Sequence, residues 1–372
     1  MKIGIITLHN SFSFGACLQA YATYMAVRQL GHEAVMIDYR NSYEQSQNHV
    51  LPTQKDISLK KRIVTVAENI LLLKLHNQNR SFRGFHNIYE KTDYYSSAEE
   101  IQGQSFDCLI SGSDQLWNPD IFGGIDTAFF LDFGSENCRR VSYAASAGSH
   151  VFTNEEISLI YPLLKRYYAV SVREEKLKKQ IDSIIGINAK TVLDPTFLLP
   201  VSHWRQFMGE PLYREHYILL YMIGVPYSEY KTKYAPVVRF YSEKLNLPVF
   251  GVSQMSFVKT LGVDRALCGL TPQQLIRAIN DADLVITSSF HGVAFSVQLN
   301  RRFAALKTEN PDRVNCLLES VGLENRIIDG LDEKKCISLL NEIDYSEVNQ
   351  KLGLLKEDSL SWLRRQLDYE QH

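Results

Sequence analysis

The feature that most constrains the fold is a repeated alternation between short apolar runs and longer amphipathic segments. Residues 2–8 form an apolar run, and residues 16–30 have helical apolar spacing before a second apolar run at 33–38. Gly31 separates the helix from the second run, at a position where helices commonly end. A strand, a helix and a returning strand form the opening unit of a doubly wound parallel sheet. We therefore predict an α/β fold.

The alternation restarts after a break at Pro195 and Pro200. Before the break, the pattern predicts strands at 106–110, 140–145 and 169–172 and a helix at 155–167. After it, the pattern predicts strands at 217–222, 248–252 and 284–287 and helices at 229–245, 271–280 and 292–299. Two such units predict two Rossmann-like domains that face each other across a cleft. We place them at 1–205 and 206–345, with a C-terminal helix at 346–372 packing across their junction.

Composition excludes several classes of protein. The 372 residues suffice for two separate cores, and 45% hydrophobic and 22% charged residues are typical of globular proteins. A net charge of -2 gives no reason to expect a nucleic-acid partner. No apolar stretch approaches the roughly 18 residues of a membrane span, and the first run is too short for a signal peptide. The six cysteines lack C-x-x-C spacing, which predicts reduced thiols and a cytoplasmic location.

Common cofactor and metal motifs are absent from the sequence. It contains no Gly-x-Gly pair, no Gly-Lys-Ser/Thr loop and no His-Glu-x-x-His helix. Asp281 and Asp283 have the D-x-D form that some glycosyltransferases use to hold a metal. Because they precede an apolar strand, a turn-capping role is the favoured interpretation. We predict no metal site and no resident cofactor.

The segment 283–297 (DLVITSSFHGVAFSV) gives the strongest site signal. A buried strand runs into Ser289, His291 and Gly292, which open the next helix. Ligands of open α/β sheets bind at the carboxyl ends of strands, and a helix N-terminus favours phosphate or carboxylate. His291 would add a titratable donor beside this anion site. The alternative is a histidine whose ring bonds a backbone carbonyl.

Three further cations follow predicted strands or open a helix. Arg173 directly follows the strand at 169–172, Lys307 follows the run at 303–306, and Arg313 lies on a predicted helix. Arg173 could bind a phosphate or carboxylate through two hydrogen bonds, or it could pair with a neighbouring glutamate. Such a set suits a small ligand with two or three negative charges.

The loop after the strand at 106–110 concentrates polar and aromatic side chains. It carries Asp114, Gln115, Trp117 and Asn118. An aromatic face with carboxylate and amide groups suits a sugar, since it offers stacking and hydrogen bonds together. Trp117 could equally anchor the loop in the core.

Five segments occur in order along the chain: FGACLQAYA (14–22), GSDQLWNP (112–119), SVRE (171–174), LDPT (193–196) and SFHG (289–292). Because of these segments, the chain resembles the polysaccharide pyruvyl transferase family over residues 3–328. The resemblance implies a fold similar to the GT-B glycosyltransferases, phosphoenolpyruvate as donor, and a pyruvate ketal on a sugar as product.

The resemblance also implies roles for residues. It assigns the donor site to Arg173 and His291, with Lys307 as a looser match. To these we add Ser289, Gly292 and Arg313 from the helix start and the cations described above. We assign the acceptor site to Ser13, Gly15, Gln19, Asp114, Gln115, Trp117 and Asn118. Within these sets, His291 is the expected general acid, and Asp114 is expected to orient or deprotonate the acceptor.

Several alternatives stay open. Residues 56–80 mix apolar and basic side chains. They predict a helical insertion packed on its own domain or, less favoured, an amphipathic helix on the inner membrane face beside a lipid-linked acceptor. A GT-B glycosyltransferase using a nucleotide sugar is the main rival function, and a non-catalytic binding protein is the second. The acceptor sugar and the oligomeric state are not indicated by the sequence.

Overall fold

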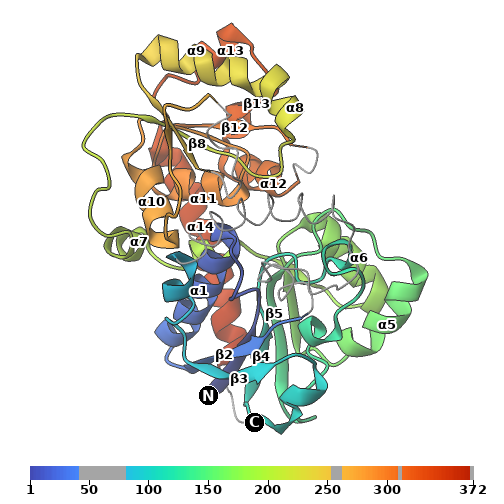
Figure 1. Ribbon diagram of the computed structural model, residues 1–372. Helices are drawn as coiled ribbons and strands as arrows, with labels where there is room; N and C mark the ends of the chain where they lie inside the picture. The colour runs from blue at the N-terminus through green and yellow to red at the C-terminus, as the bar shows by residue number, and fades with distance from the viewer. Residues whose placement is uncertain (42–80, 253–261, 309–311, 369–372) are drawn as a thin grey trace, which may run out of the picture. The chain divides into compact units, whose positions relative to one another are not determined.

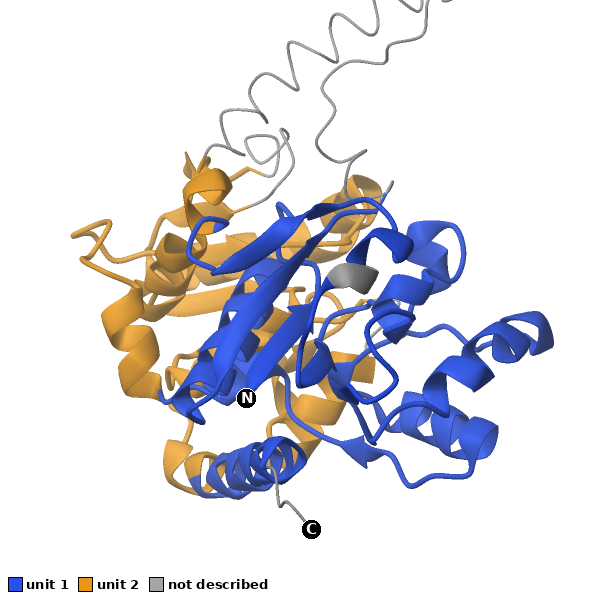
Figure 2. Ribbon diagram, turned by 90° about the horizontal axis from the view of Figure 1, so that it is seen from below, with its two compact units in different colours: residues 1–47, 86–200, 350–372 blue, residues 48–85, 201–349 orange. Residues whose placement is uncertain are grey.

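The computed structural model describes residues 1–41, 81–252, 262–308 and 312–368. The chain forms two compact units, which Figure 2 shows in blue and orange. The first unit contains residues 1–47, 86–200 and 350–372, and the second contains residues 48–85 and 201–349. The C-terminal helix α14 (Tyr345–Leu367) therefore begins in the second unit and continues in the first. The predicted helix within 56–80 lies outside the described residues.

The first unit is built on a parallel sheet in the order β3-β2-β1-β4-β5-β6-β7 (Figure 1). Its strands are β1 Lys2–Ile6, β2 Glu33–Tyr39, β3 Lys91–Tyr95, β4 Cys108–Ser111, β5 Arg139–Ala145, β6 Ala169–Val172 and β7 Lys190–Thr191. Its helices are α1 Phe14–Gln29, α4 Pro119–Phe122, α5 Asn154–Leu164 and α6 Glu175–Ile185, with short 3₁₀ turns η1 Glu99–Gly103, η2 Thr127–Phe130 and η3 Pro195–Phe197. The strand order reverses between β1 and β4, which makes their carboxyl ends a topological switch point.

The second unit repeats this plan with the order β10-β9-β8-β11-β12-β13, again parallel. Its strands are β8 Ile218–Tyr221, β9 Val249–Val252, β10 Arg265–Ala266, β11 Leu284–Thr287, β12 Phe303–Leu306 and β13 Ile327–Ile328. Its helices are α7 Val201–Phe207, α8 Tyr227–Glu229, α9 Ala235–Leu245, α10 Pro272–Asp281, α11 Phe290–Gln298, α12 Asp312–Val321 and α13 Glu333–Ser338, with a π-helical turn η4 Tyr230–Tyr234 and a 3₁₀ turn η6 Glu324–Arg326. Here the order reverses between β8 and β11.

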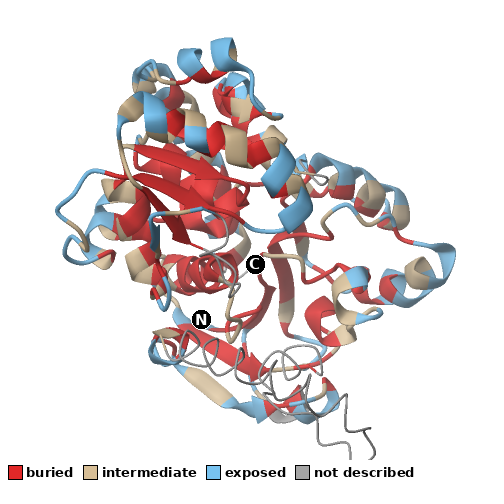
Figure 3. Ribbon diagram, turned by 45° about the horizontal axis from the view of Figure 1, so that its top comes forward, coloured by how far each residue is buried: buried red, intermediate tan, exposed pale blue. Residues whose placement is uncertain are grey.

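Each sheet is the centre of its own core. Figure 3 shows the central strands buried and the outer helix faces exposed. Strands with two covered faces read as continuous apolar runs, as in β8 (ILLY) and β11 (LVIT). Helix α1 is buried on nearly every side, which explains why its apolar residues do not form one stripe. Among the described residues, no helix combines the length and hydropathy that a membrane span needs.

The prediction of two Rossmann-like α/β units is confirmed, with differences at individual elements. The helix predicted at 229–245 is interrupted by η4 before α9 begins. Pro236 lies in the first turn of α9, where it lacks the N–H that would continue the α-helical pattern. Strand β3 was not predicted, because its sequence KTDYY contains no apolar run.

Candidate functional site

The switch point of the second unit is formed by the carboxyl ends of β8 and β11. Strand β11 ends at Thr287, and the Ser289 hydroxyl caps α11 by accepting a hydrogen bond from the Gly292 N–H at 3.4 Å. A Cβ on residue 292 would lie 2.3 Å from Thr287 Oγ1, so only glycine fits there. The cap starts α11 at Phe290, two residues earlier than the sequence pattern predicts.

His291 lies in the first turn of α11, at this switch point. His291 is 6% exposed. The neighbouring Phe290 ring stands edge-on to its imidazole, with ring centroids 5.2 Å apart. The Arg313 guanidinium lies 5.8 Å from the Phe290 ring centroid. The structure thus places Ser289, His291 and Gly292 at the N-terminus of α11, with Arg313 beside the Phe290 ring. This end of the helix favours a negatively charged ligand.

Lys307 directly follows β12, the strand next to β11 in the sheet. Its ammonium is half-exposed and forms an ion pair with Asp329 at 2.9 Å. The same carboxylate also pairs with Lys233. Two lysines therefore share one aspartate at the carboxyl edge of the second sheet. Lys233 also pairs with Glu229 at 3.4 Å, so the two lysines and two carboxylates together carry no net charge.

Arg173 belongs to the first unit, and three predicted segments converge on it. Its guanidinium lies 2.6 Å from Asp194, 3.5 Å from Glu174 and 3.9 Å from Asp114. The side chain is 4% exposed, and those of Glu174 and Asp194 are 2% and 0% exposed. Burial disfavours the charged guanidinium, but the three carboxylates outweigh it and raise the pKa of Arg173. One buried positive charge thus faces three negative charges.

The neighbours of this arginine are themselves held in place. Asp194 caps η3 by accepting from the Thr196 N–H at 3.0 Å, and Ser146 donates to Glu174 at 2.6 Å. Sequence reasoning did not assign Asp194 a site role, although it lies within the segment 193–196. The donor-binding role of Arg173 stays a prediction; in this structure its charge is shared among carboxylates.

Asp114 is the most exposed of the three carboxylates, at 16% for the side chain. Its φ is +77°, a left-handed conformation that residues other than glycine seldom adopt. Ala144, on the adjacent strand β5, also has a positive φ of +54°. Strained backbone is retained where surrounding structure fixes it, and it is common at functional sites. The local geometry is compatible with the predicted role of Asp114 toward an acceptor.

The remaining residues of the 112–119 loop divide into two groups. Trp117 is 1% exposed, stacks on Phe130 at 5.0 Å and donates its indole N–H to the Phe129 carbonyl. It therefore anchors the loop in the core, one of the two roles that the sequence left open, and its ring is not exposed to stack on a sugar. Gln115 and Asn118 are hydrogen-bonded to each other at 2.8 Å.

The residues predicted around the start of α1 lie after β1. Ser13 is the N-cap residue of α1, and Gly15 is buried in its first turn. Gln19 is buried as well, and its amide donates to the Thr7 hydroxyl at 2.8 Å. Thr7 in turn donates to the Ser113 carbonyl at 3.1 Å. These bonds join the loops after β1 and β4 at the switch point of the first unit. Gln19 therefore holds the Thr7 side chain, and Thr7 in turn holds the loop at Ser113.

The loop after β1 is also held by a buried ion cluster at Asp38. His9 donates to the Asp38 carboxylate at 3.1 Å, and Arg40 donates to it twice at 2.7 Å. Burial raises the pKa of Asp38, but the hydrogen bonds from His9 and Arg40 outweigh it and hold the pKa well below its ordinary value of 3.8. The ionised carboxylate is thus favoured by the folded state.

This cluster predicts a pH dependence of stability. Because the folded-state pKa is depressed, the contribution of Asp38 is fully present above 3.8 and is lost as pH falls below it. The wild type is expected to unfold at a higher urea concentration than Asp38→Asn at pH 7, and the gap should narrow toward pH 3. Urea titrations at several pH values measure this. A gap that widens in acid would contradict the assignment.

The D-x-D pair forms hydrogen bonds and ion pairs rather than helix caps. Asp281 pairs with Arg277 one helical turn earlier at 2.7 Å. Asp283 accepts from the Tyr217 N–H at 3.2 Å and lies 3.1 Å from His216. Within the described ranges, no group of three or more His, Cys, Asp or Glu side chains is placed to hold a metal ion.

Solved structures similar to this chain share its two-unit architecture. A UDP-GlcNAc 2-epimerase of Rickettsia bellii superposes with a TM-score of 0.51 at 9% identity, covering 98% of each chain. The enzyme of the same name from Methanocaldococcus jannaschii gives 0.50 at 13% identity, covering 95% of this chain and 99% of the other. These similarities establish a GT-B-like fold, as predicted, and at this identity they concern the fold alone.

Comparison at the level of sequence is more specific. No curated protein matches the chain. A sequence model of polysaccharide pyruvyl transferases, by contrast, matches residues 14–310, well over half of the chain. The match includes the segments that converge on Arg173 and the helix start that carries His291. The chain therefore belongs to the polysaccharide pyruvyl transferase family.

Proposed function

We propose that the protein transfers the pyruvyl group of phosphoenolpyruvate to two hydroxyls of a sugar in a glycan, forming a pyruvate ketal and releasing phosphate. Family membership supports a transferase acting on polysaccharide. The single observation that carries the finer proposal is the position of His291. It is a titratable side chain in the first turn of α11, at the carboxyl end of β11 and at the switch point of its sheet.

The donor carries a phosphate and a carboxylate, and the N-terminus of α11 suits such an anion. In the proposal, the positive end of the α11 dipole favours one anionic group, and the charges of Lys307 and Arg313 offset the others. Lys307 lies at the end of the neighbouring strand, and its ion pair with Asp329 would have to open for it to contact the donor. Arg173 is kept as a predicted donor contact of the first unit.

The reaction proceeds by addition to the double bond followed by substitution. His291 donates a proton to the methylene carbon, which becomes a methyl group, and the central carbon becomes electrophilic. A sugar hydroxyl adds to that carbon and loses its proton, for which Asp114 is the proposed acceptor. The C–O bond to phosphate breaks, the second hydroxyl adds, and its proton leaves with phosphate. Asp114 then releases its proton to solvent and His291 takes one up, which restores both groups. One hydroxyl proton thus replaces the proton given to the methyl group, and the other leaves on phosphate, so the reaction balances without a resident cofactor.

A thermal titration tests the donor. Phosphoenolpyruvate at about 100 times its dissociation constant is expected to stabilise the native state by roughly 2.7 kcal/mol, visible as a higher Tm. Pyruvate and inorganic phosphate serve as controls for the separate anionic groups. A nucleotide sugar tests the rival function, a glycosyltransferase. Stabilisation by the nucleotide sugar alone would reject the proposal in favour of that rival.

A further inference from the structure

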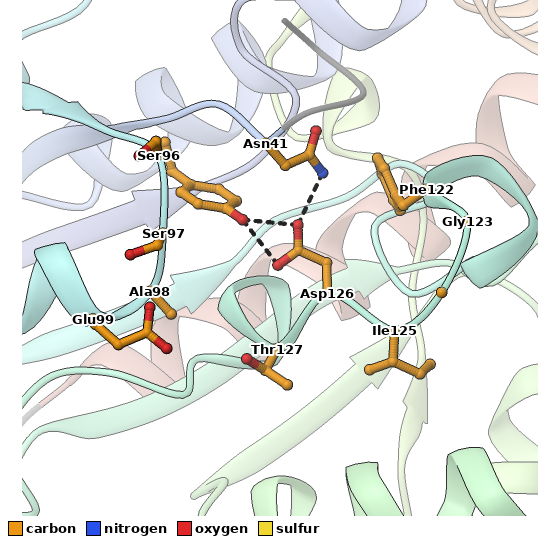
Figure 4. Close-up of a pocket in the computed structure, with 12 residues that line it drawn as sticks. Asn41, Ser96, Ser97, Ala98, Glu99, Phe122, Gly123, Ile125, Asp126 and Thr127 are labelled. Carbon is orange, nitrogen blue, oxygen red and sulfur yellow. Dashed lines mark hydrogen bonds between the residues drawn. The ribbon is translucent and has the colours of Figure 1, made fainter. Parts of the chain in front are cut away.

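A polar pocket of about 420 Å³ lies at the carboxyl edge of the first sheet, and none of the predicted site residues lines it (Figure 4). Tyr39 ends β2 on one side, Ser96 and Ser97 follow β3, and residues 122–127 form the opposite wall. Small-molecule sites of proteins measure about 300–1,000 Å³, so the pocket has room for a ligand of that class. The pocket lies at the carboxyl ends of the strands, which is where open α/β sheets bind ligands.

A carboxylate at the centre of the pocket is held in a fixed orientation. The Tyr39 hydroxyl lies 3.0 and 2.9 Å from the two oxygens of Asp126, and Asn41 Nδ2 donates to Oδ2 at 2.9 Å. Oδ1 also accepts the Ala128 N–H at 3.1 Å and so caps η2. Because tyrosine and asparagine are both buried, this geometry is fixed before any ligand arrives.

The charge of the lining selects against anions. Asp126 and Glu99 are acidic, and no Lys, Arg or His stands among the described residues that line the pocket. Phosphoenolpyruvate or a nucleotide would meet like charge there. Ser96, Ser97 and Thr127 add hydroxyls, whereas Phe122 and Ile125 add apolar surface. A neutral sugar matches both kinds of lining, since its hydroxyls form hydrogen bonds with the polar side chains and its C–H face packs on the apolar ones.

The wall of the pocket connects to the family segment at 112–119. Tyr39 packs edge-on to Phe129 at 5.5 Å, and the Phe129 carbonyl accepts hydrogen bonds from Trp117 and Ser111. Both donors are buried. Trp117 therefore supports the turn η2, whose first residue Thr127 lines the pocket, rather than contacting a sugar itself.

We propose that this pocket binds a neutral pyranose unit of the glycan acceptor, at a subsite separate from the residues predicted to contact the reacting hydroxyls. The inference rests on the proposed function only in taking a glycan as the source of the sugar. Binding itself needs neither donor nor turnover. The subsite would hold the acceptor by a unit that is not itself modified.

The test measures sugar binding without donor. Methyl glycosides of glucose, galactose, mannose and N-acetylglucosamine are titrated against the full-length protein by saturation-transfer NMR. Ser97→Trp fills the pocket and is expected to weaken binding at least tenfold. Its matched control, Ser105→Trp, carries the same substitution in a separate pocket of about 530 Å³ lined also by Arg166 and Glu136. That control should bind like wild type, and circular dichroism verifies that both variants fold.

A second variant tests the carboxylate. Asp126→Asn keeps the side-chain shape but removes the charge, and we expect it to weaken sugar binding about tenfold. Failure of the whole panel to bind wild type, or equal loss in Ser97→Trp and Ser105→Trp, would overturn the subsite. Phosphate release from phosphoenolpyruvate is assayed separately. Sugar binding without phosphate release would support the subsite and reject the proposed reaction. Phosphate release without sugar binding would support the proposed reaction and reject the subsite.

Discussion

His291→Ala is expected to release phosphate from phosphoenolpyruvate about 100- to 10,000-fold more slowly than wild type, while folding normally. The magnitude is that of a positioned proton donor. The imidazole lies in the first turn of α11, where the positive end of the helix dipole that favours the donor remains after the substitution. Donor affinity should therefore change less than turnover. Steady-state phosphate release, with kcat and KM determined separately, measures both.

An exposed histidine of the same unit provides the control. His216 is 79% exposed at the side chain and contacts Asp283 at the start of β11. His216→Ala should retain wild-type turnover. Near-normal turnover in His291→Ala would remove this histidine from the reaction. A large rise in KM with unchanged kcat would instead make it a binding residue.

Arg173→Met is expected to lower the free energy of unfolding by about 3–5 kcal/mol, because it leaves three carboxylates without the guanidinium between them. Asp194 is the nearest, at 2.6 Å, and is fully buried. The double variant Arg173→Met with Asp194→Asn should recover part of this loss, since one of the uncompensated charges is then gone. Urea denaturation of the wild type, both single variants and the double variant gives the coupling free energy between Arg173 and Asp194.

The matched control is an exposed ion pair in the same unit. Arg166 lies 3.1 Å from Asp132, with both side chains more than a third exposed. Arg166→Met should cost less than about 1 kcal/mol. If Arg173→Met is as stable as wild type but loses the thermal shift with phosphoenolpyruvate, the arginine is a donor ligand rather than a structural ion pair. Loss of stability together with an unchanged shift in the folded protein would assign it to the structure alone.

Much of the fold could be predicted because buried parallel strands have a simple signature. The runs at β6 (AVSV) and β11 (LVIT) are apolar at three of their four positions, and the structure places both strands where the pattern does. Strand β3 escaped prediction since its residues are polar or aromatic and partly exposed. The two-residue strands β7 and β13 are too short to form any pattern.

The site was less predictable, because it depends on residues far apart in the sequence. His291 could be located from a strand followed by a capping serine and a glycine. The contact of Arg173 with Glu174 was one of the two alternatives that the sequence left open. The contacts with Asp114 and Asp194 could not be predicted, since these carboxylates come from loops after different strands and local sequence does not reveal which of them meet. The pocket at Asp126 joins Tyr39 to a turn that lies 87 positions away. Trp117 shows the same limit, because an indole in a polar loop reads equally as a sugar platform or an anchor.

The most direct test of the central claim is to follow the carbon atoms of the donor. The protein is incubated with ¹³C-labelled phosphoenolpyruvate and a panel of glycan acceptors, and the acceptors are analysed by mass spectrometry and NMR. The account predicts that all three donor carbons appear on one acceptor as a ketal with a ¹³C-methyl group, with phosphate released in equal amount. Glycosyl transfer from a nucleotide sugar, with no labelled carbon on any acceptor, would contradict it.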